Sequence, residues 1–268
     1  MPELNAVVIQ REDVAPGLMV IRVAAQGWTL PPFKAGQFAV LGLPASAPRS
    51  ATSEPEDPGT PIQGGFLRRA YSIASSSLEQ QYLEFYIIQV KSGGLTPRLF
   101  ALKVGDPLWL GPKMTGAFTL DEVAGARNLV FIATGTGLAP YMSMLRTHLL
   151  DAPSSRKFAV IHGARHASDL GYREELFHME RDHAAFTYLP VITRPDPAWQ
   201  GLTGRLQDFW ATNPLERTWG RRPSPAGTDI FLCGNPGMVE ALMKHLEAEG
   251  FREHTRKEPG QVHFEKYW

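Results

Sequence analysis

The pattern of apolar and polar positions changes near the middle of the chain. In the first half, short runs of apolar, β-branched and aromatic residues alternate with clusters of Gly, Pro and Ser, which predicts β-strands. The predicted strands are Ala6–Gln10, Leu18–Ala24, Gln37–Leu43, Arg69–Ala74, Tyr82–Val90 and Pro107–Leu110. One helix is predicted near Thr96–Leu102, where Pro97 suits a first turn. Short strands with this punctuation favour a closed barrel or a sandwich.

From about Gly125 onward, continuous apolar runs alternate with amphipathic stretches. The pairs are Asn128–Ala133 with Leu138–Leu150, Phe158–His162 with Leu170–Asp182, and Ile230–Cys233 with Met238–Glu249. Apolar strands followed by helices predict a parallel sheet with helices on its faces. We therefore expect two domains, residues 1–120 and residues 121–268, the second with an α/β fold.

The segment Pro44–Gly65 differs from both halves. It is rich in Pro, Ser, Gly and Thr, with scattered acidic residues. Such a segment has little apolar surface to offset the entropy lost on ordering. We expect it to be a long mobile loop.

Charge and composition exclude several classes of protein. Lys plus Arg and Asp plus Glu are 27 each, so the chain lacks the basic excess of a nucleic-acid binder. Four basic pairs are interpreted as solvated surface: Arg68–Arg69, Arg156–Lys157, Arg221–Arg222 and Arg256–Lys257. The single cysteine, Cys233, excludes an internal disulfide and a cysteine-held iron–sulfur cluster.

Other sequence signals narrow the expected surroundings of the protein. The eight histidines show no metal-ligand spacing, so no metal site is expected. The first residues do not resemble a secretory signal, and no apolar stretch approaches the roughly 20 residues of a membrane helix. A cytoplasmic location without membrane or nucleic-acid partners is the expectation.

A possible cofactor motif lies in the first half at Arg69–Ser75. In a strand, Arg69 and Tyr71 point to one face, and Ala70 and Ser72 to the other. The arginine could neutralise a pyrophosphate while the tyrosine ring stacks on a flat heterocycle. An ordinary cross-strand Arg–Tyr pair would explain the same residues.

A second motif, Gly94-Leu-Thr-Pro97, leads into the predicted helix. Glycine allows close approach of a ligand, and the free amides and the Thr96 hydroxyl at a helix start could bind an anion. A plain helix cap at Thr96 is the alternative interpretation.

The second half carries a glycine-rich turn, Ala133-Thr-Gly-Thr-Gly-Leu-Ala-Pro140, between a predicted strand and a helix. Gly135 and Gly137 would let a pyrophosphate approach amides at a positive helix end. It is not a G-x-G-x-x-G fingerprint, because Pro140 takes the third position, and it is not a P-loop. Phe231-Leu-Cys-Gly-Asn-Pro-Gly-Met238 has a similar place, where Cys233 is either an inert buried residue or part of a site.

Together these motifs resemble the ferredoxin–NADP⁺ reductase family, in its bacterial form. Arg69, Tyr71 and Ser72 match the family's Arg-x-Tyr-Ser pattern, and Gly94 with Thr96 matches its diphosphate site. The resemblance runs from about Val7 to Trp268, interrupted by the Pro44–Gly65 loop, which is longer than the family norm. It implies a six-stranded antiparallel β-barrel that binds FAD, followed by an α/β parallel-sheet domain that binds NADP(H).

The resemblance also implies roles for individual residues. It assigns to FAD Arg69, Ala70, Tyr71, Ser72, Tyr86, Gly94, Leu95, Thr96, Thr136, Tyr267 and Trp268. It assigns to NADP(H) Gly135, Gly137, Arg165, Arg194, Arg205, Gly234 and Asn235. The catalytic set that it implies is Ser72, Thr136, Cys233 and Glu265, with Cys233 as a positioning group where the nicotinamide meets the flavin.

Three arginines decide the expected choice of nicotinamide cofactor. The 2′-phosphate of NADP(H) suits a bidentate cation, whereas the ribose hydroxyls of NAD(H) are often met by an acid. Arg165, Arg194 and Arg205 occupy the positions where bacterial members of the family hold this phosphate, and no acid takes their place. NADP(H) is therefore predicted.

The chain ends in two aromatic residues, Tyr267 and Trp268, where a polar tail is usual. Aromatic groups left exposed would lose roughly 1.5–3 kcal/mol each relative to burial, so they need a flat surface to cover. The ending resembles a bacterial subgroup of the family, which implies Tyr267 on the isoalloxazine and Trp268 on the adenine, or the reverse. Glu265 keeps the spacing of the glutamate that assists the nicotinamide site.

The expected activity is hydride transfer between NADP(H) and FAD, with single electrons passing between FAD and ferredoxin or flavodoxin. We also expect an acidic carrier to dock on the basic pairs and the protein to be a monomer. Two alternatives stay open. One is an NADH-dependent reductase component of an oxygenase, and the other is a flavin-binding electron-transfer subunit without nicotinamide activity.

Overall fold

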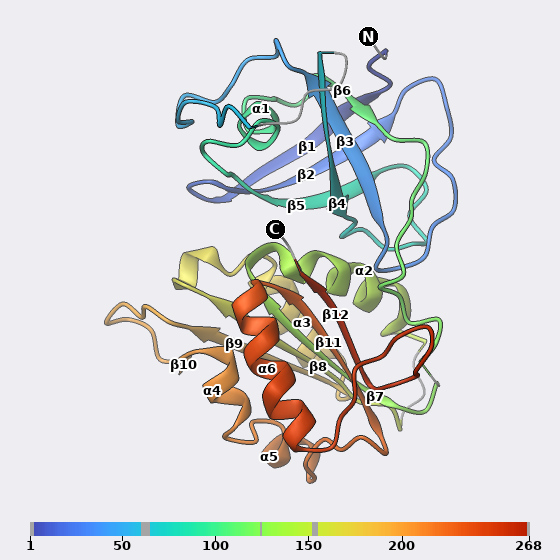
Figure 1. Cartoon of the computed structure of the whole chain (residues 1–268), viewed down its shortest axis with the longest axis vertical. Coiled ribbons are helices and arrows are strands. Elements are labelled where there is room, and N and C mark those ends of the chain that lie inside the picture. The colour runs from blue at the N-terminus through green and yellow to red at the C-terminus, as the bar shows by residue number, and fades with distance from the viewer. Residues whose placement is uncertain (1–2, 60–64, 124, 152–154, 267–268) are drawn as a thin grey trace. The chain divides into compact units, whose positions relative to one another are not determined.

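The computed structural model in Figure 1 describes residues 3–59, 65–123, 125–151 and 155–266. The chain forms two compact units. The first comprises Met1–Thr119 with Ala139–Thr147, and the second Leu120–Leu138 with His148–Trp268.

The first unit is built on an antiparallel sheet (Figure 1). Its strands are β1 (Ala6–Ala15), β2 (Leu18–Ala25), β3 (Phe38–Pro44), β4 (Phe66–Ser72), β5 (Leu83–Ile88) and β6 (Pro107–Leu110). They lie in the order β4-β3-β6-β1-β2-β5, and an antiparallel bridge between Ile73 and Phe85 joins the two edges. The sheet therefore closes into a barrel, which confirms the predicted six-stranded antiparallel fold.

Alternation along the strands fills the barrel. Phe85 and Ile87 of β5 point into the core, as do Met19 and Ile21 of β2. Residues between them, such as Glu84 and Tyr86, therefore lie on the other face of the strand. The predicted helix is a single turn, α1 (Thr96–Leu99).

Helix α2 (Ala139–His148) belongs with the barrel over residues 139–147, although it follows a strand of the second unit. Its Arg146 donates from Nη1 to Glu84 Oε1 at 2.6 Å and to the Ala74 carbonyl at 2.9 Å. Glu84 is 2% exposed and also accepts a 2.8 Å hydrogen bond from Arg22 Nε. Two guanidinium groups thus stabilise one buried carboxylate.

The second unit is built on a parallel sheet in the order β10-β9-β8-β7-β11-β12 (Figure 1). Its strands are β7 (Asn128–Thr134), β8 (Phe158–Ala164), β9 (Phe186–Ile192), β10 (Leu202–Thr203), β11 (Thr228–Gly234) and β12 (Val262–Lys266). Its helices are the 3₁₀ turns η1 (Gly135–Leu138) and η2 (Ala167–Asp169), and α3 (Arg173–Asp182), α4 (Leu206–Trp210), α5 (Glu216–Trp219) and α6 (Pro236–Ala248). The predicted α/β parallel-sheet fold is confirmed.

Side chains from α4, α5 and α6 pack on one face of this sheet, against Val130, Ile161 and Ile230 among others. On α3, the Phe177 ring packs edge-on against Tyr188 of β9, with centroids 5.0 Å apart. Burial on both faces explains why the central strands are continuous apolar runs.

The terminal segment Val262–Lys266 forms an edge strand, β12, paired with β11. One expectation about the fold needs correction. Arg156, expected on the solvated surface, is 8% exposed and lies over the Phe158 ring. The described part of the loop 44–65 makes hydrogen bonds to the rest of the barrel unit, and its expected mobility stays a prediction.

Among the described residues, no helix is both long enough and apolar enough to cross a bilayer. Nor do any three His, Cys, Asp or Glu side chains of the described residues gather in a way that could hold a metal ion.

Candidate functional site

The predicted flavin residues of β4 lie near the end of the strand. Tyr71 is half-buried and packs against the barrel core, and Ser72 is buried. Burial raises the pKa of the Tyr71 phenol, an effect that the nearby Arg69 opposes. Ala70 and Arg69 are exposed. The Arg69 guanidinium donates to the carbonyl of Arg68, but it has no acidic partner among the described residues, so it can accept an anion.

The segment after β5 lies toward the other end of β4, beyond Arg69 and away from Ser72. Because β4 and β5 run antiparallel from the Ile73–Phe85 bridge, Arg69 and Gly94 both lie toward the end where β4 begins and β5 finishes. Tyr86, on the outer face of β5, is 4% exposed. The arrangement brings a cation, aromatic rings and a glycine-rich turn to one side of the first unit.

The turn itself has the chemistry of an anion site. Gly94 and Leu95 are buried, and within the described part of the chain no group accepts from their backbone amides or from that of Thr96. Buried amides without an acceptor are rare, and a phosphate oxygen would satisfy them. The residues of this turn therefore fit a diphosphate.

The hydroxyl of Thr96 was interpreted either as an anion ligand or as a plain helix cap, and the structure gives it a different role. The helix is capped by Leu95 without a side-chain hydrogen bond, so the plain Thr96 cap is wrong. Its hydroxyl accepts from the Val90 amide at 3.0 Å and donates to the Val90 carbonyl at 3.2 Å. Thr96 therefore holds the turn against the end of β5, and only its remaining lone pair and its amide are available to a ligand.

The second unit carries the other glycine-rich turn, between β7 and α2. Gly135 has a φ of +53°, and a Cβ there would meet nothing within 4 Å, so the turn has open space above it. At Gly137 a Cβ would clash with the Cys233 carbonyl oxygen and lie 2.7 Å from its carbonyl carbon. Gly137 thus lets the turn lie directly on the end of β11, with Thr136 8% exposed.

Three strands bring the remaining predicted nicotinamide residues together. Cys233 of β11 is paired with Ala133 of β7 on one side and with Glu265 of β12 on the other. Cys233 is fully buried, while Glu265 is half-buried. Both lie at the carboxyl edge of the parallel sheet, where open α/β sheets bind their ligands.

The turn after β11 is shaped by Gly234 and Asn235. Gly234 has a φ of +128°, and a Cβ there would clash with the Thr134 hydroxyl. That hydroxyl accepts from the Asn235 amide at 2.8 Å. The Asn235 side chain caps α6 by accepting from the Met238 amide at 3.2 Å, so it already has a structural role.

The three predicted phosphate-binding arginines follow three adjacent strands. Arg165 comes after β8, Arg194 after β9, and Arg205 after β10 as the residue before α4. The Arg194 amide donates to the Arg165 carbonyl at 2.8 Å, which fixes these two side by side. All three are exposed, and none of their guanidinium groups has an ion-pair partner among the residues described. This cationic row fits a terminal phosphate.

His162 of β8 lies beside the second turn and was not predicted. It is paired with Ala133, two residues before Gly135, and is fully buried. Burial lowers its pKa to about 4, and a hydrogen bond with the Gly135 backbone opposes this shift. Its Nδ1 lies 3.4 Å from the Tyr188 hydroxyl. The sequence could have indicated this residue, because His162 stands within a predicted buried strand, Phe158–His162, of the same sheet as the glycine-rich turn.

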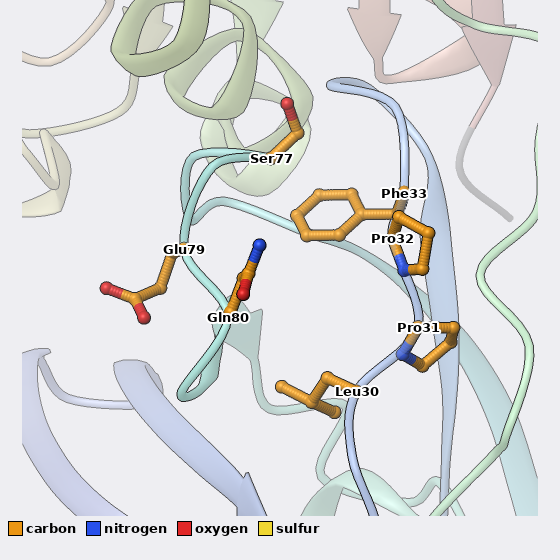
Figure 2. Close-up of a pocket in the computed structure, with 7 residues that line it drawn as sticks. All are labelled: Leu30, Pro31, Pro32, Phe33, Ser77, Glu79 and Gln80. Carbon is orange, nitrogen blue, oxygen red and sulfur yellow. The ribbon is translucent and has the colours of Figure 1, made fainter.

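A separate pocket in the first unit contains none of the predicted site residues. Figure 2 shows it between the Leu30–Phe33 segment and Ser77, Glu79 and Gln80. Its volume is about 240 Å³, below the roughly 300–1,000 Å³ typical of ligand pockets. The pocket is therefore small for a cofactor site.

The two terminal aromatic residues, Tyr267 and Trp268, lie outside the described residues, so their stacking roles stay predictions.

Comparison with known proteins places this geometry in a family. Residues 131–244 match the family model described as the oxidoreductase NAD-binding domain. The flavodoxin/ferredoxin–NADP reductase of Escherichia coli (strain K12) is 34% identical over 238 residues, covering 88% of each chain. The chain belongs to the flavodoxin/ferredoxin–NADP reductase family. Another family member, the ferredoxin–NADP reductase of Pseudomonas aeruginosa, is 32% identical over 248 residues, covering 87% of this chain and 86% of its own.

A solved structure shares the fold of this family. The ferredoxin NADP⁺ reductase from Neisseria gonorrhoeae, with bound FAD and NADP, matches with a TM-score of 0.80 at 24% sequence identity. The match covers 98% of this chain and 97% of that one. The membership of the subgroup that ends in Tyr-Trp stays a prediction.

Proposed function

We propose that this protein is an FAD-dependent reductase that transfers hydride between NADP(H) and FAD and passes single electrons between FAD and ferredoxin or flavodoxin. The observation that carries the proposal is a pair of glycine turns, Gly94–Thr96 with amides that have no acceptor among the described residues and Gly135–Gly137 with open space at Gly135. Both are accompanied by arginines that have no acidic partner in the described part of the chain. Family membership supports the same activity.

In this proposal residues 1–120 hold FAD. Arg69 and the amides of Gly94, Leu95 and Thr96 bind the diphosphate, while Tyr71 and Tyr86 contact the ring system, beside Ala70. When bound, FAD supplies the exchange between two-electron and one-electron chemistry. Ser72 positions the reacting edge of the ring, and the terminal Tyr267 and Trp268 cover the isoalloxazine and the adenine.

Residues 121–268 hold NADP(H) in the same proposal. Arg165, Arg194 and Arg205 bind the 2′-phosphate, and Gly135 and Gly137 admit the pyrophosphate. Gly234 and the backbone of Asn235 complete the turn.

Three further side chains orient the nicotinamide at the sheet edge: Thr136, Cys233 and Glu265. Cys233 is fully buried and acts by shape and contact, since hydride transfer needs no thiolate nucleophile. A half-buried carboxylate at Glu265 would stabilise positive charge on the nicotinamide ring.

The physiological partner is proposed to be an acidic carrier protein that meets a monomer of this chain in the cytoplasm. Three of the four basic pairs are exposed and could receive it: Arg68–Arg69, Arg221–Arg222 and Arg256–Lys257. Association with such a carrier should weaken as ionic strength rises.

Absorption spectroscopy tests the proposal directly. The purified protein, or its apoprotein supplied with FAD, should be yellow, and anaerobic NADPH should bleach the flavin absorbance. Persistent colour would favour an electron-transfer subunit without nicotinamide activity. Steady-state diaphorase rates with NADPH and NADH then test the cofactor choice. A clear preference for NADH would instead favour the reductase component of an oxygenase.

A further inference from the structure

The long loop between β3 and β4 folds back onto the turn that follows β5. The Glu54 amide donates to the Lys91 carbonyl at 3.0 Å, and the Asp57 amide donates to the Ser92 carbonyl at 2.9 Å. The Ser50 amide donates to the Pro97 carbonyl at 2.9 Å. The loop is thus fastened on both sides of Gly94–Thr96, the proposed diphosphate turn.

Two arginines reach the turn itself. Arg49 donates from Nη1 to the Gly93 carbonyl at 2.8 Å and from Nη2 to the Lys91 carbonyl at 3.1 Å. Arg98, 6% exposed, donates from Nη1 to the Gly94 carbonyl at 2.6 Å, and its other nitrogens bond the Ala45 carbonyl. Each of the two glycine carbonyls therefore has its own guanidinium.

One carboxylate oxygen joins the two arginines. Glu56 Oε2 accepts from Arg98 Nη1 at 2.9 Å and from Arg49 Nη1 at 3.2 Å. The other oxygen, Oε1, is buried and has no hydrogen-bond partner in the described part of the chain. The carboxylate is therefore stabilised by these two guanidinium groups, and in turn it fixes both of them.

Because the peptide group is planar, the two arginines that bind the carbonyl groups also fix the direction of the neighbouring amides. In a planar trans peptide the carbonyl of one residue and the amide of the next point in opposite directions. When Arg49 holds the Gly93 carbonyl, the Gly94 amide is directed away from the loop. When Arg98 holds the Gly94 carbonyl, the Leu95 amide is directed likewise. These are the amides that have no acceptor among the described residues.

We propose that Glu56 and Arg49, on the inserted loop, are positioning residues that pre-orient the Gly94 and Leu95 amides for the diphosphate of FAD. The inference rests on the proposed function. Neither side chain needs to touch the cofactor; each acts through the peptide groups of the turn. A turn fixed in advance loses less entropy when the diphosphate binds.

The decisive variant is Glu56→Gln, which keeps the shape and removes the charge between the two arginines. Its matched control is Glu54→Gln, an exposed acid of the same loop that accepts a hydrogen bond from Arg49 through its backbone carbonyl and not through its carboxylate. We expect Glu56→Gln to raise the Kd for FAD about tenfold, the effect of one charge-assisted hydrogen bond, and Glu54→Gln to change it less than twofold. Both Kd values are measured by titrating the apoproteins with FAD and recording the quenching of flavin fluorescence.

A spectrum separates positioning from general damage. The bound FAD of Glu56→Gln should keep the wild-type absorption spectrum, because the ring contacts on β4 and β5 are unchanged. Equal FAD affinity in the two glutamine variants would overturn the inference while leaving the proposed function intact. A shifted spectrum in Glu56→Gln alone would also overturn it, since the damage would then extend to the ring site.

A second variant covers the case in which Glu56→Gln does not fold. Arg49→Lys keeps the charge beside Glu56, but a single ammonium cannot reproduce the fork that meets several carbonyls. Its Kd for FAD should rise at least threefold with an unchanged spectrum, and an unchanged Kd would refute the inference. If wild-type apoprotein does not take up FAD at all, the proposed function fails, and the inference fails with it.

Discussion

The two glycine turns solve one problem in different ways. Gly94–Thr96 is oriented by side chains from elsewhere in the barrel unit, chiefly Arg49 and Arg98. Gly135–Gly137 is oriented by backbone packing, because Gly137 lies against the carbonyl of Cys233. A turn held by ion pairs can be adjusted by changing a distant side chain. A turn held by close packing depends on the absence of a side chain at one position.

The largest expected effect comes from adding one methyl group to the packed turn. In Gly137→Ala the Cβ clashes with the Cys233 backbone, which cannot move aside as a flexible side chain could. We expect the Kd for NADP⁺ to rise about a hundredfold, within the roughly 1–3 kcal/mol cost of overpacking, while FAD affinity is retained. Isothermal titration with NADP⁺ measures it.

Gly125→Ala is the matched control, because a Cβ there would meet nothing within 4 Å. If Gly137→Ala binds NADP⁺ as the control does, the turn is not held by packing, and the contrast between the two turns fails.

Acid should act on the packed turn through the buried His162. Its pKa is lowered to about 4 in the folded protein from an ordinary value of 6.5, so the unfolded chain binds the proton more readily. The free energy of unfolding therefore falls as the pH decreases from 6.5 toward 4 and is unaffected by this group above that range. At pH 5 the loss from His162 should be about 2 kcal/mol.

Urea titrations at pH 7 and pH 5 check this expectation. His162→Gln should show a smaller difference in unfolding free energy between the two pH values than wild type does. His178→Gln, which replaces an exposed histidine of α3, should keep the wild-type difference. A variant at His162 that remains as acid-sensitive as wild type would contradict the assignment.

A smaller effect is expected at the exposed arginine row. Replacing both Arg165 and Arg205 with alanine should raise the KM for NADPH at least tenfold and leave the KM for NADH nearly unchanged. Because these guanidinium groups are exposed, each contact with the phosphate contributes only about 1 kcal/mol, and the two together correspond to a change of tenfold or somewhat more. Arg221→Ala, another exposed arginine, is the control. Unchanged NADPH kinetics in the double variant would remove the phosphate assignment.

The sequence predicts the two folds well because hydrophobic periodicity reports burial. The strands β7, β8 and β11 are covered on both faces and read as unbroken apolar runs. The extent of β9 was harder to predict, because Pro190 argues against a central strand. The two-residue β10 pairs only with Val191 and Ile192, so β9 is close to an edge strand at that proline.

The missed features depend on polar contacts that hydropathy does not record. The loop Pro44–Gly65 has few apolar residues, and its composition does not reveal the hydrogen bonds that join Arg49, Glu56 and Arg98. Likewise, the sequence motifs predict the positions of the two glycine turns. They do not show that Asn235 caps a helix or that His162 lies beside Gly135.

The path of the chain through α2 limits how the protein can be divided. The polypeptide leaves the barrel unit at Thr119, forms β7, returns to the barrel unit for residues 139–147, and leaves again. A truncated fragment ending at residue 119 would keep Arg22 but lose Arg146, leaving the buried Glu84 carboxylate with one guanidinium instead of two. A single cut that keeps Arg146 with the flavin half must fall after residue 147, and it then also removes β7 from the second unit.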